Sequence, residues 1–223
     1  MIFDCTDVKA FLFDLDGTLV DTEAFWAQAI ADCLASSGAA VTGAEILEIS
    51  WGRSWPDIRR ILIARFPSAP FTSPEADADL LRPYYRRLVD DDPAKTIIPG
   101  SIAFFRRAVQ TAPCAIVSGS PHADVVAAAE LCGIDKDVSF ILGGEDYSNG
   151  KPDPECFLKA AERFGVEARH CVVVEDSPAG VRAAVSAGMR AIARVPHGHE
   201  DDPAYALAAL RVSELSTVSL VCR

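Results

Sequence analysis

Two aspartates one residue apart, Asp14 and Asp16, are the residues whose types and spacing first indicate chemistry. They follow residues 8–13, a run that is apolar apart from Lys9 and suits a strand covered on both faces, as in a parallel sheet. Side chains two residues apart on a strand point to the same side, and the chain is expected to turn at Gly17. Both carboxylates are therefore expected to address one point.

A second acidic pair, Glu175 and Asp176, follows another apolar run at residues 171–174. If both runs are parallel strands of one sheet, three or four carboxylates gather in one crevice. Carboxylates at such a short distance repel one another unless one of them is protonated or a cation lies between them. Mg²⁺ fits such a site, because it takes one or two carboxylates together with substrate phosphate.

Partners for a phosphate occur elsewhere in the chain. Lys151 lies in NGKPDP before a predicted helix, and Ser118 lies in IVSGSP after a predicted strand. A hydroxyl, backbone N–H groups and an ammonium together would hold a phosphoryl group. Asp14 would then attack phosphorus to form an acyl phosphate. Asp16 would protonate the leaving oxygen and later deprotonate the water that hydrolyses the intermediate.

The elements that must position these residues alternate between strands and helices. Apolar runs predict strands at residues 8–13, 114–117, 139–142, 171–174 and 191–195. Helical patterns lie at residues 102–110, 122–131, 155–164 and 179–187. This alternation predicts an α/β fold with a doubly wound, mostly parallel sheet and a Rossmann-like core.

The segment 18–91 differs from the rest, because it has helical periods and no clear strand. The periods fall at residues 25–34, 44–49, 57–66 and 75–89, and all three tryptophans lie in this segment. Pro93, Pro99 and Gly100 break any helix at its end. We expect residues 1–17 and 92–223 to form the α/β catalytic core and residues 18–91 to form an inserted, all-helical domain.

Three predicted helix starts share one pattern, a capping side chain followed by proline at the first helical position. They are Ser120-Pro121, Asp153-Pro154 and Ser177-Pro178. In open α/β sheets, ligands bind at the carboxyl ends of the strands, and helix N-termini there attract anions such as phosphate.

Composition excludes several other classes of protein. The net charge of −11 disfavours nucleic-acid binding, which needs a basic face. The seven cysteines are odd in number and contain no Cys-x-x-Cys pair, which fits a reducing compartment. No apolar run reaches the ~20 residues that cross a bilayer. We expect a cytoplasmic monomer with neither a membrane nor a nucleic-acid partner.

The motifs DLDGT, Ser118, GKPDP and EDS occur in this order at spacings that resemble the haloacid dehalogenase-like hydrolase superfamily. The resemblance implies that Asp14 is the nucleophile and Asp16 the acid/base. It implies a phosphate site formed by Gly17, Thr18, Ser118, Gly119 and Lys151. It also implies Mg²⁺ bound by Asp14, by Asp16 through its backbone carbonyl, and by Asp176, with Glu175 nearby. Glu175 is interpreted either as a direct ligand or as an acceptor for the adjacent helix start.

The inserted segment resembles the helical cap of the β-phosphoglucomutase-like branch, which closes over the site. In that branch a loop like WGRSW contacts the far end of the substrate, which implies specificity roles for Trp51, Gly52 and Arg53. The alternative is that Trp51 and Trp55 pack in the core of the cap. The sugar phosphomutases have a basic residue and an arginine where this chain has these two tryptophans, which favours hydrolysis.

The sequence therefore predicts a Mg²⁺-dependent phosphatase of a small organic phosphate monoester, such as a sugar phosphate or a phosphoglycolate-like compound. One alternative is a sugar phosphomutase of the β-phosphoglucomutase type. The other is a catalytically silent protein that binds a phosphometabolite or has a regulatory role.

Overall fold

The computed structural model describes residues 1–50, 53 and 55–222. The chain divides into a core unit, Met1–Val20 with Ile97–Arg223, and a helical unit, Asp21–Thr96. Val20 bridges Ile97, and the N–H of Ile98 donates to the carbonyl of Leu19 at 3.0 Å. The chain therefore leaves and re-enters the core unit at neighbouring points. The sequence predicts these boundaries at 17/18 and 91/92.

The core unit contains a six-stranded sheet in the order β4-β3-β2-β5-β6-β7, and all its pairs are parallel. Its strands are β2 (Ala10–Phe13), β3 (Cys114–Val117), β4 (Val138–Leu142), β5 (Cys171–Glu175), β6 (Arg190–Arg194) and β7 (Leu210–Val212). A separate parallel pair joins β1 (Ile2–Asp4) to β8 (Ser219–Val221). The predicted α/β fold with a doubly wound, mostly parallel sheet is confirmed.

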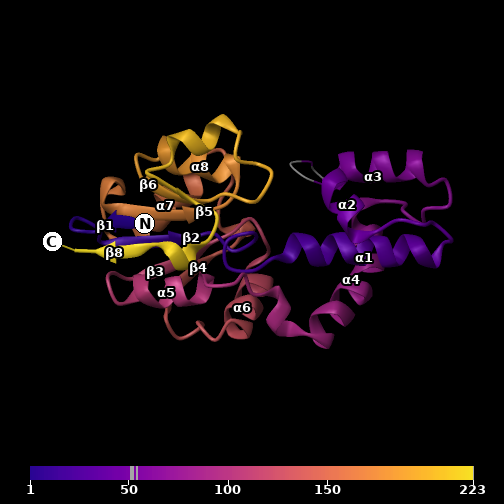
Figure 1. Ribbon diagram of the computed structural model, residues 1–223, viewed down its shortest axis with the longest axis horizontal. Helices are drawn as coiled ribbons and strands as arrows, with labels where there is room; N and C mark the ends of the chain where they lie inside the picture. The colour runs from indigo at the N-terminus through magenta and orange to yellow at the C-terminus, as the bar shows by residue number, and fades with distance from the viewer. Residues whose placement is uncertain (51–52, 54, 223) are drawn as a thin grey trace. The chain divides into compact units, whose positions relative to one another are not determined.

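Helices cover both faces of the six-stranded sheet, and Figure 1 shows α5 and α8 on opposite sides of it. The helices of the core unit are α5 (Ser101–Val109), α6 (His122–Leu131), α7 (Glu155–Phe164) and α8 (Pro178–Ser186). Successive residues of β2 face the helix layers on opposite sides of the sheet. Phe11 and Phe13 pack with α5 and α6, whereas Ala10 and Leu12 pack with α7 and α8. Burial on both faces explains why this strand is apolar throughout.

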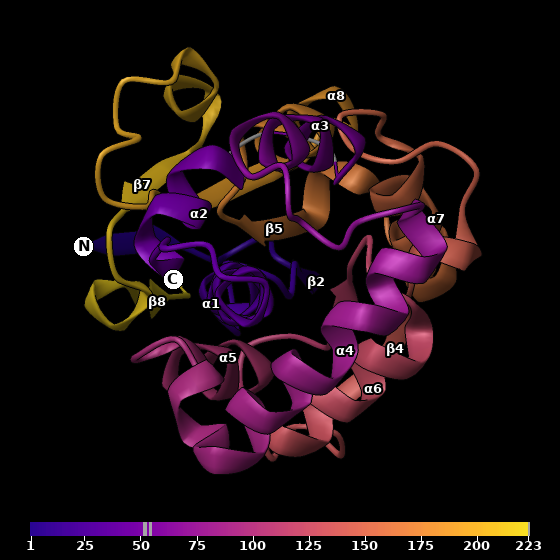
Figure 2. The same ribbon diagram turned by 90° about the vertical axis from the view of Figure 1, so that its right-hand side faces the viewer.

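The helical unit consists of α1 (Thr22–Ser36), α2 (Gly43–Ser50), α3 (Trp55–Arg65) and α4 (Pro74–Asp91). Helix α1, seen end-on in Figure 2, packs against α2 and α4. Its buried side chains include Ile30 and Leu34, which join Ile46, Leu62 and Leu81 in a core separate from those of the sheet. No helix in the described part of the chain is long and apolar enough to span a membrane.

Two of the three predicted capping residues are wrong by one position, although helices α6 and α7 span the predicted residues. Helix α8 begins as predicted, with Ser177 as the N-cap accepting from the N–H of Gly180 at 3.0 Å. In α6 and α7, however, Pro121 and Pro154 are the N-caps. The side chain of Asp153 still accepts from the N–H of Glu155, the first residue of α7, at 2.9 Å. The side chain of Ser120 has a different partner, which is described with the site.

The prediction also missed β1, β7 and β8, which have three residues each. Strands this short carry too little alternation to be distinguished from a loop.

Candidate active site

The predicted chemical residues come together at the carboxyl ends of three neighbouring strands. Strand β2 lies between β3 and β5, and its last residue, Phe13, pairs with Ile116 on one side and Val174 on the other. The loops that follow these strands therefore start side by side. They carry Asp14 and Asp16 after β2, Ser118 after β3, and Glu175 and Asp176 at the end of β5.

A largely buried lysine links the loops after β2 and β5. The Nζ of Lys151 lies 2.5 Å from Oδ1 of Asp14 and 2.7 Å from Oε1 of Glu175. It also donates to the carbonyl of Val117 at 3.2 Å. The side chain of Lys151 is 12% exposed and that of Glu175 only 1%. The cation and the carboxylate predicted to attack phosphorus thus lie in direct contact.

Burial and charge act against each other at this pair. Burial is the largest cause that raises the pKa of Asp14. Lys151 lowers this pKa and the carboxylates of Glu175 and Asp16 raise it, and together these effects bring it to about 8. Burial disfavours the charge on Lys151, but Asp14 and Glu175 outweigh it and hold the pKa of Lys151 well above its usual value. Lys151 is therefore a permanent cation, and Asp14 needs a further positive charge to stay ionised at neutral pH.

The side chain of Asp16 is held by two serines of the loop after β3. Its Oδ2 accepts from the Oγ of Ser118 at 3.2 Å and from the Oγ of Ser120 at 2.7 Å. The Oγ of Ser118 in turn accepts from the N–H of Ser120 at 3.0 Å. Ser120 is a residue that sequence reasoning assigned only to a helix cap. The signal that could have found it is a second hydroxyl two residues after Ser118.

Asp14, Glu175 and Asp176 form a buried group of possible metal ligands, whose carboxylate oxygens lie within 4.8 Å of one another. No other group of this kind occurs among the residues that the structure describes. Glu175 is already engaged, since Oε1 contacts Lys151 and Oε2 accepts from the N–H of Ser177 at 2.7 Å and from its Oγ at 2.9 Å. Both carboxylate oxygens of Glu175 therefore already accept hydrogen bonds from other residues.

The turn after β2 is packed directly against Asp176. Gly17 has a φ of +81°, and a Cβ placed there would lie 2.0 Å from Oδ2 of Asp176. The N–H of Gly17 donates to the carbonyl of Val20 at 2.7 Å, and the N–H of Thr18 donates to the carbonyl of Leu15 at 3.2 Å. The hydroxyl of Thr18 lies 3.4 Å from Oδ1 of Asp176. In this structure the N–H groups of Gly17 and Thr18 therefore stabilise the turn itself.

The loop after β3 presents Gly119, whose N–H forms no hydrogen bond among the described residues. Two residues that the sequence analysis did not identify, Tyr147 and Gly144, form hydrogen bonds with this loop. The hydroxyl of Tyr147 donates to the carbonyl of Ser118 at 2.9 Å, and the N–H of Gly144 donates to that of Ser120 at 2.9 Å. A Cβ on Gly144 would lie 2.4 Å from the carbonyl oxygen of Gly119. The paired glycines after β4 are the sequence signal for this close approach.

Two residues near the C-terminus fix the acidic loops. The hydroxyl of Tyr205, which is fully buried, donates to the backbone carbonyl of Asp176 at 2.5 Å. Arg194 donates to the carbonyl of Gly17 at 2.8 Å. Neither residue belongs to a recognisable motif, so only the three-dimensional structure connects them to the site.

Of the residues predicted to set specificity, Trp51 and Gly52 lie outside the described residues. Arg53 lies in the helical unit, where it donates to the carbonyls of Ile49 at 2.6 Å and Glu48 at 3.4 Å.

Comparison with known families gives the class of protein. Residues 8–188, most of the chain, match the family model of the haloacid dehalogenase-like hydrolases. The chain belongs to this family. The match confirms the resemblance inferred from the four motifs and the prediction of a hydrolase.

Relatives in the family include named phosphatases, which support phosphatase activity. Hexitol phosphatase A of Escherichia coli K12 is 31% identical over 186 residues, which cover 83% of this chain and 82% of the relative. Phosphoglycolate phosphatase of the same strain is 28% identical over 202 residues, covering 82% and 79%. A hydrolase of the family from Deinococcus radiodurans R1, solved with bound phosphate and sodium, has a TM-score of 0.73 at 27% identity, covering 95% and 93%.

The packing of Gly17 against Asp176 predicts the effect of one added methyl group. Gly17→Ala places a Cβ on the Asp176 carboxylate and should lower kcat/KM for p-nitrophenyl phosphate by about 100-fold or more, because small displacements of reacting groups are costly. Gly188→Ala is the matched control, since Gly188 has a similar φ of +76° but open space around its Cβ. Wild-type activity in Gly17→Ala would contradict the described contact.

Proposed function

We propose that this hydrolase is a Mg²⁺-dependent phosphatase that cleaves a small organic phosphate monoester through an aspartyl phosphate on Asp14. The observation that carries the proposal is the buried contact of Asp14 with Lys151, beside an Asp16 held by two serine hydroxyls. A carboxylate, a fixed cation and a second carboxyl group are the parts that nucleophilic phosphoryl transfer requires.

The phosphoryl group would bind between the turn after β2, which carries Asp14 and Asp16, and the loop after β3, which carries Ser118 and Gly119. The ammonium of Lys151, the hydroxyl of Ser118 and the N–H of Gly119 supply positive charge and donors for its oxygens. Gly17 and Thr18, also predicted as phosphate ligands, shape the loop on which Asp16 is carried. Such donors are fixed before the substrate arrives, so they require little reorganisation during the reaction.

The reaction then proceeds in two steps. An oxygen of Asp14 attacks phosphorus as the ester P–O bond breaks, and Asp16 gives its proton to the departing alkoxide. Asp16, now a carboxylate, takes a proton from the water that attacks phosphorus in the second step. The bond between phosphorus and Asp14 breaks, inorganic phosphate leaves, and Asp16 is again protonated.

The possible ligands fit a hard cation, because they are buried carboxylate oxygens. Gly17, which has no Cβ, leaves space beside the carboxylate of Asp176. Asp14, Asp176 and the backbone carbonyl of Asp16 would hold Mg²⁺. When bound, Mg²⁺ supplies the positive charge that keeps Asp14 ionised and offsets the charge of the phosphoryl group.

The first substrates to assay are sugar phosphates and phosphoglycolate, since relatives are named hexitol and phosphoglycolate phosphatases. The helical unit would act as the cap that excludes water, with Trp51, Gly52 and Arg53 near the organic part of the substrate. A cytoplasmic, monomeric enzyme remains the prediction from the sequence.

A sugar phosphomutase of the β-phosphoglucomutase type differs from a phosphatase in its product. With β-glucose 1-phosphate and a bisphosphate primer, a mutase yields the isomeric hexose phosphate, whereas a phosphatase yields free phosphate. We expect free phosphate, and accumulation of the isomer would replace the proposed function by the mutase.

Asp14→Asn removes the proposed nucleophile while keeping its size. Turnover of p-nitrophenyl phosphate should fall by at least ~10³-fold, because an amide oxygen does not form the acyl phosphate. Asp135→Asn, at an exposed position of the core unit, is the matched control and should retain wild-type activity. Activity close to wild type in Asp14→Asn would rule out the mechanism.

Magnesium binding should depend on pH through Asp14. The pKa of Asp14 is raised to about 8, so below pH 8 this carboxyl group is mostly protonated, and cation binding must displace the proton. The Kd for Mg²⁺ should therefore rise as the pH falls from 8 to 6, by up to about tenfold per unit, with proton release on binding. Isothermal titration calorimetry in buffers of different ionisation enthalpy measures both quantities.

Treatment with EDTA should abolish turnover, and Mg²⁺ should restore it. A pH-independent Kd without proton release would contradict the ligand role of Asp14.

A further inference from the structure

Two cysteines from opposite ends of the sequence meet at the small parallel pair of strands β1 and β8 (Figure 1). The last register partners of this pair are Asp4 and Val221, and the next residue on each side is a cysteine, Cys5 or Cys222. The N–H of Cys5 donates to the carbonyl of Val221 at 2.8 Å. The ladder of hydrogen bonds therefore extends to Cys5, and its register places Cys222 opposite.

The side chains of the two cysteines point to the same face of this strand pair. Side chains two residues apart on a strand share a face, so Cys5 points with Phe3 and Cys222 points with Leu220. Phe3 and Leu220 are themselves register partners, and Leu220 packs against the buried cluster that contains Phe3. Burial, and after it the neighbouring thiol of Cys222, raises the pKa of Cys5 to about 11. The two thiols are thus close to each other on one face.

The spacing of paired strands suits a covalent link between these residues. Neighbouring strands lie about 4.8 Å apart. Disulfides join residues whose Cα atoms are about 4.4–6.8 Å apart, provided that their Cβ atoms point the same way. Cys222 also follows the last residue of β8, Val221, so its backbone is not held within the strand. A disulfide between positions 5 and 222 therefore requires little movement of the backbone.

The two thiols differ in their access to solvent. Cys222 is exposed, whereas Cys5 is only 2% exposed and its thiol donates to the carbonyl of Phe3 at 3.7 Å. The remaining cysteines of the chain are all buried. Cys222 is therefore the thiol that an oxidant in solution reaches first, and Cys5 is the neighbour that can complete a disulfide.

We propose that Cys5 and Cys222 form a reversible modification site, in which a small disulfide such as glutathione disulfide converts the two thiols into an intramolecular disulfide. The thiolate of Cys222 attacks one sulfur of glutathione disulfide, and one glutathione leaves. The thiolate of Cys5 then attacks the Sγ of Cys222 in this mixed disulfide, and the second glutathione leaves. The two protein thiols lose two electrons and two protons, which the two glutathione molecules carry away.

The link ties β8 to β1 across a pair that has three register partners on each strand. A disulfide that closes a long stretch of chain restricts the unfolded state and so stabilises the folded one. Neither cysteine belongs to the candidate active site, so this modification does not depend on the proposed function. Failure of the protein to hydrolyse any phosphate ester would leave it untouched.

Mass spectrometry of the full-length protein tests the site. The reduced protein is incubated with glutathione disulfide, its remaining thiols are alkylated, and it is digested without reduction. We expect the intact protein to lose two hydrogen atoms and one pair of peptides to be joined through residues 5 and 222. Dithiothreitol should reverse both changes. The linked protein should have a Tm higher by about 5 °C or more than the reduced protein.

Three variants assign the two steps. Cys222→Ser, at an exposed position with little risk to folding, should form no link and show no change in Tm on oxidation. Cys5→Ala should stop at the first step and accumulate glutathione on Cys222. Cys132→Ala, which removes a buried cysteine at the end of α6, is the control and should form the link as the wild type does.

Three results would overturn the assignment. These are a wild-type protein that keeps glutathione on Cys222 while Cys5 stays a thiol, a dimer joined through Cys222, or a disulfide that joins Cys222 to a cysteine other than Cys5.

Discussion

The site depends on one buried ammonium group that joins carboxylates from two strand ends. Without Lys151, the side chains of Asp14, Glu175 and Asp176 would place several negative charges together in a buried crevice, which is strongly unfavourable. The contacts of Lys151 with Asp14 and Glu175 compensate part of this charge. In the proposed function, the uncompensated part attracts a cation together with phosphate.

The close packing around these charges depends on two glycines, Gly17 and Gly180. A Cβ on Gly180 would lie 1.7 Å from Oε1 of Glu175, just as one on Gly17 would overlap Asp176. The first turn of α8 can approach Glu175 only because position 180 has no side chain. The acidic loops are thus fixed from several directions, by Tyr205 and Arg194 as well as by these glycines.

The sequence predicted much of this arrangement where the determining pattern is local. Helices α6 and α7 have the predicted bounds, and the strands that carry Asp14, Ser118 and Glu175 were all expected. Apolar runs, caps and terminal glycines act over a few residues and are visible in one segment. The positions of predicted site residues followed from one rule, that parallel strands bring their carboxyl ends to one edge.

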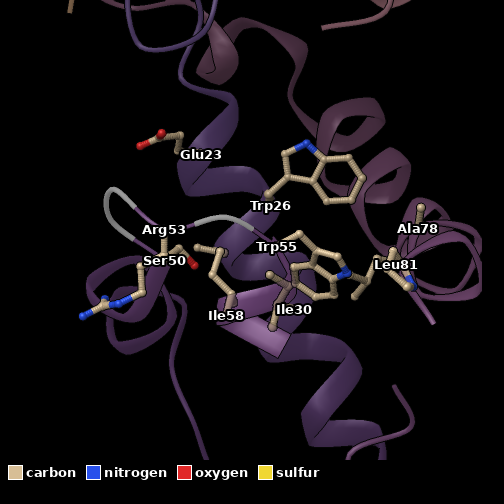
Figure 3. Close-up of a pocket in the computed structure, with 11 residues that line it drawn as sticks. Glu23, Trp26, Ile30, Ser50, Arg53, Trp55, Ile58, Ala78 and Leu81 are labelled. Carbon is tan, nitrogen blue, oxygen red and sulfur yellow. The ribbon is translucent and has the colours of Figure 1, made fainter. Parts of the chain in front are cut away.

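The remaining features depend on contacts between distant segments. Ser120 bonds Asp16 across 104 positions of the chain, and Tyr205 reaches Asp176 from a short helical turn near the C-terminus. No periodicity or motif indicates such a partner in advance. A cavity in the helical unit, shown in Figure 3, is similar, because the sequence shows tryptophans near Arg53 but not that Trp26 and Trp55 line one space.

In the proposed account, the two units divide the work between them. The core unit contains the charges for phosphoryl transfer, whereas the helical unit would act as the cap that excludes water. The central claim is that phosphorus is transferred to the carboxylate of residue 14. Rapid quenching during turnover, followed by borohydride reduction and peptide mass spectrometry, tests it most directly. The account predicts conversion of Asp14 to homoserine, and continued turnover with residue 14 unmodified would contradict it.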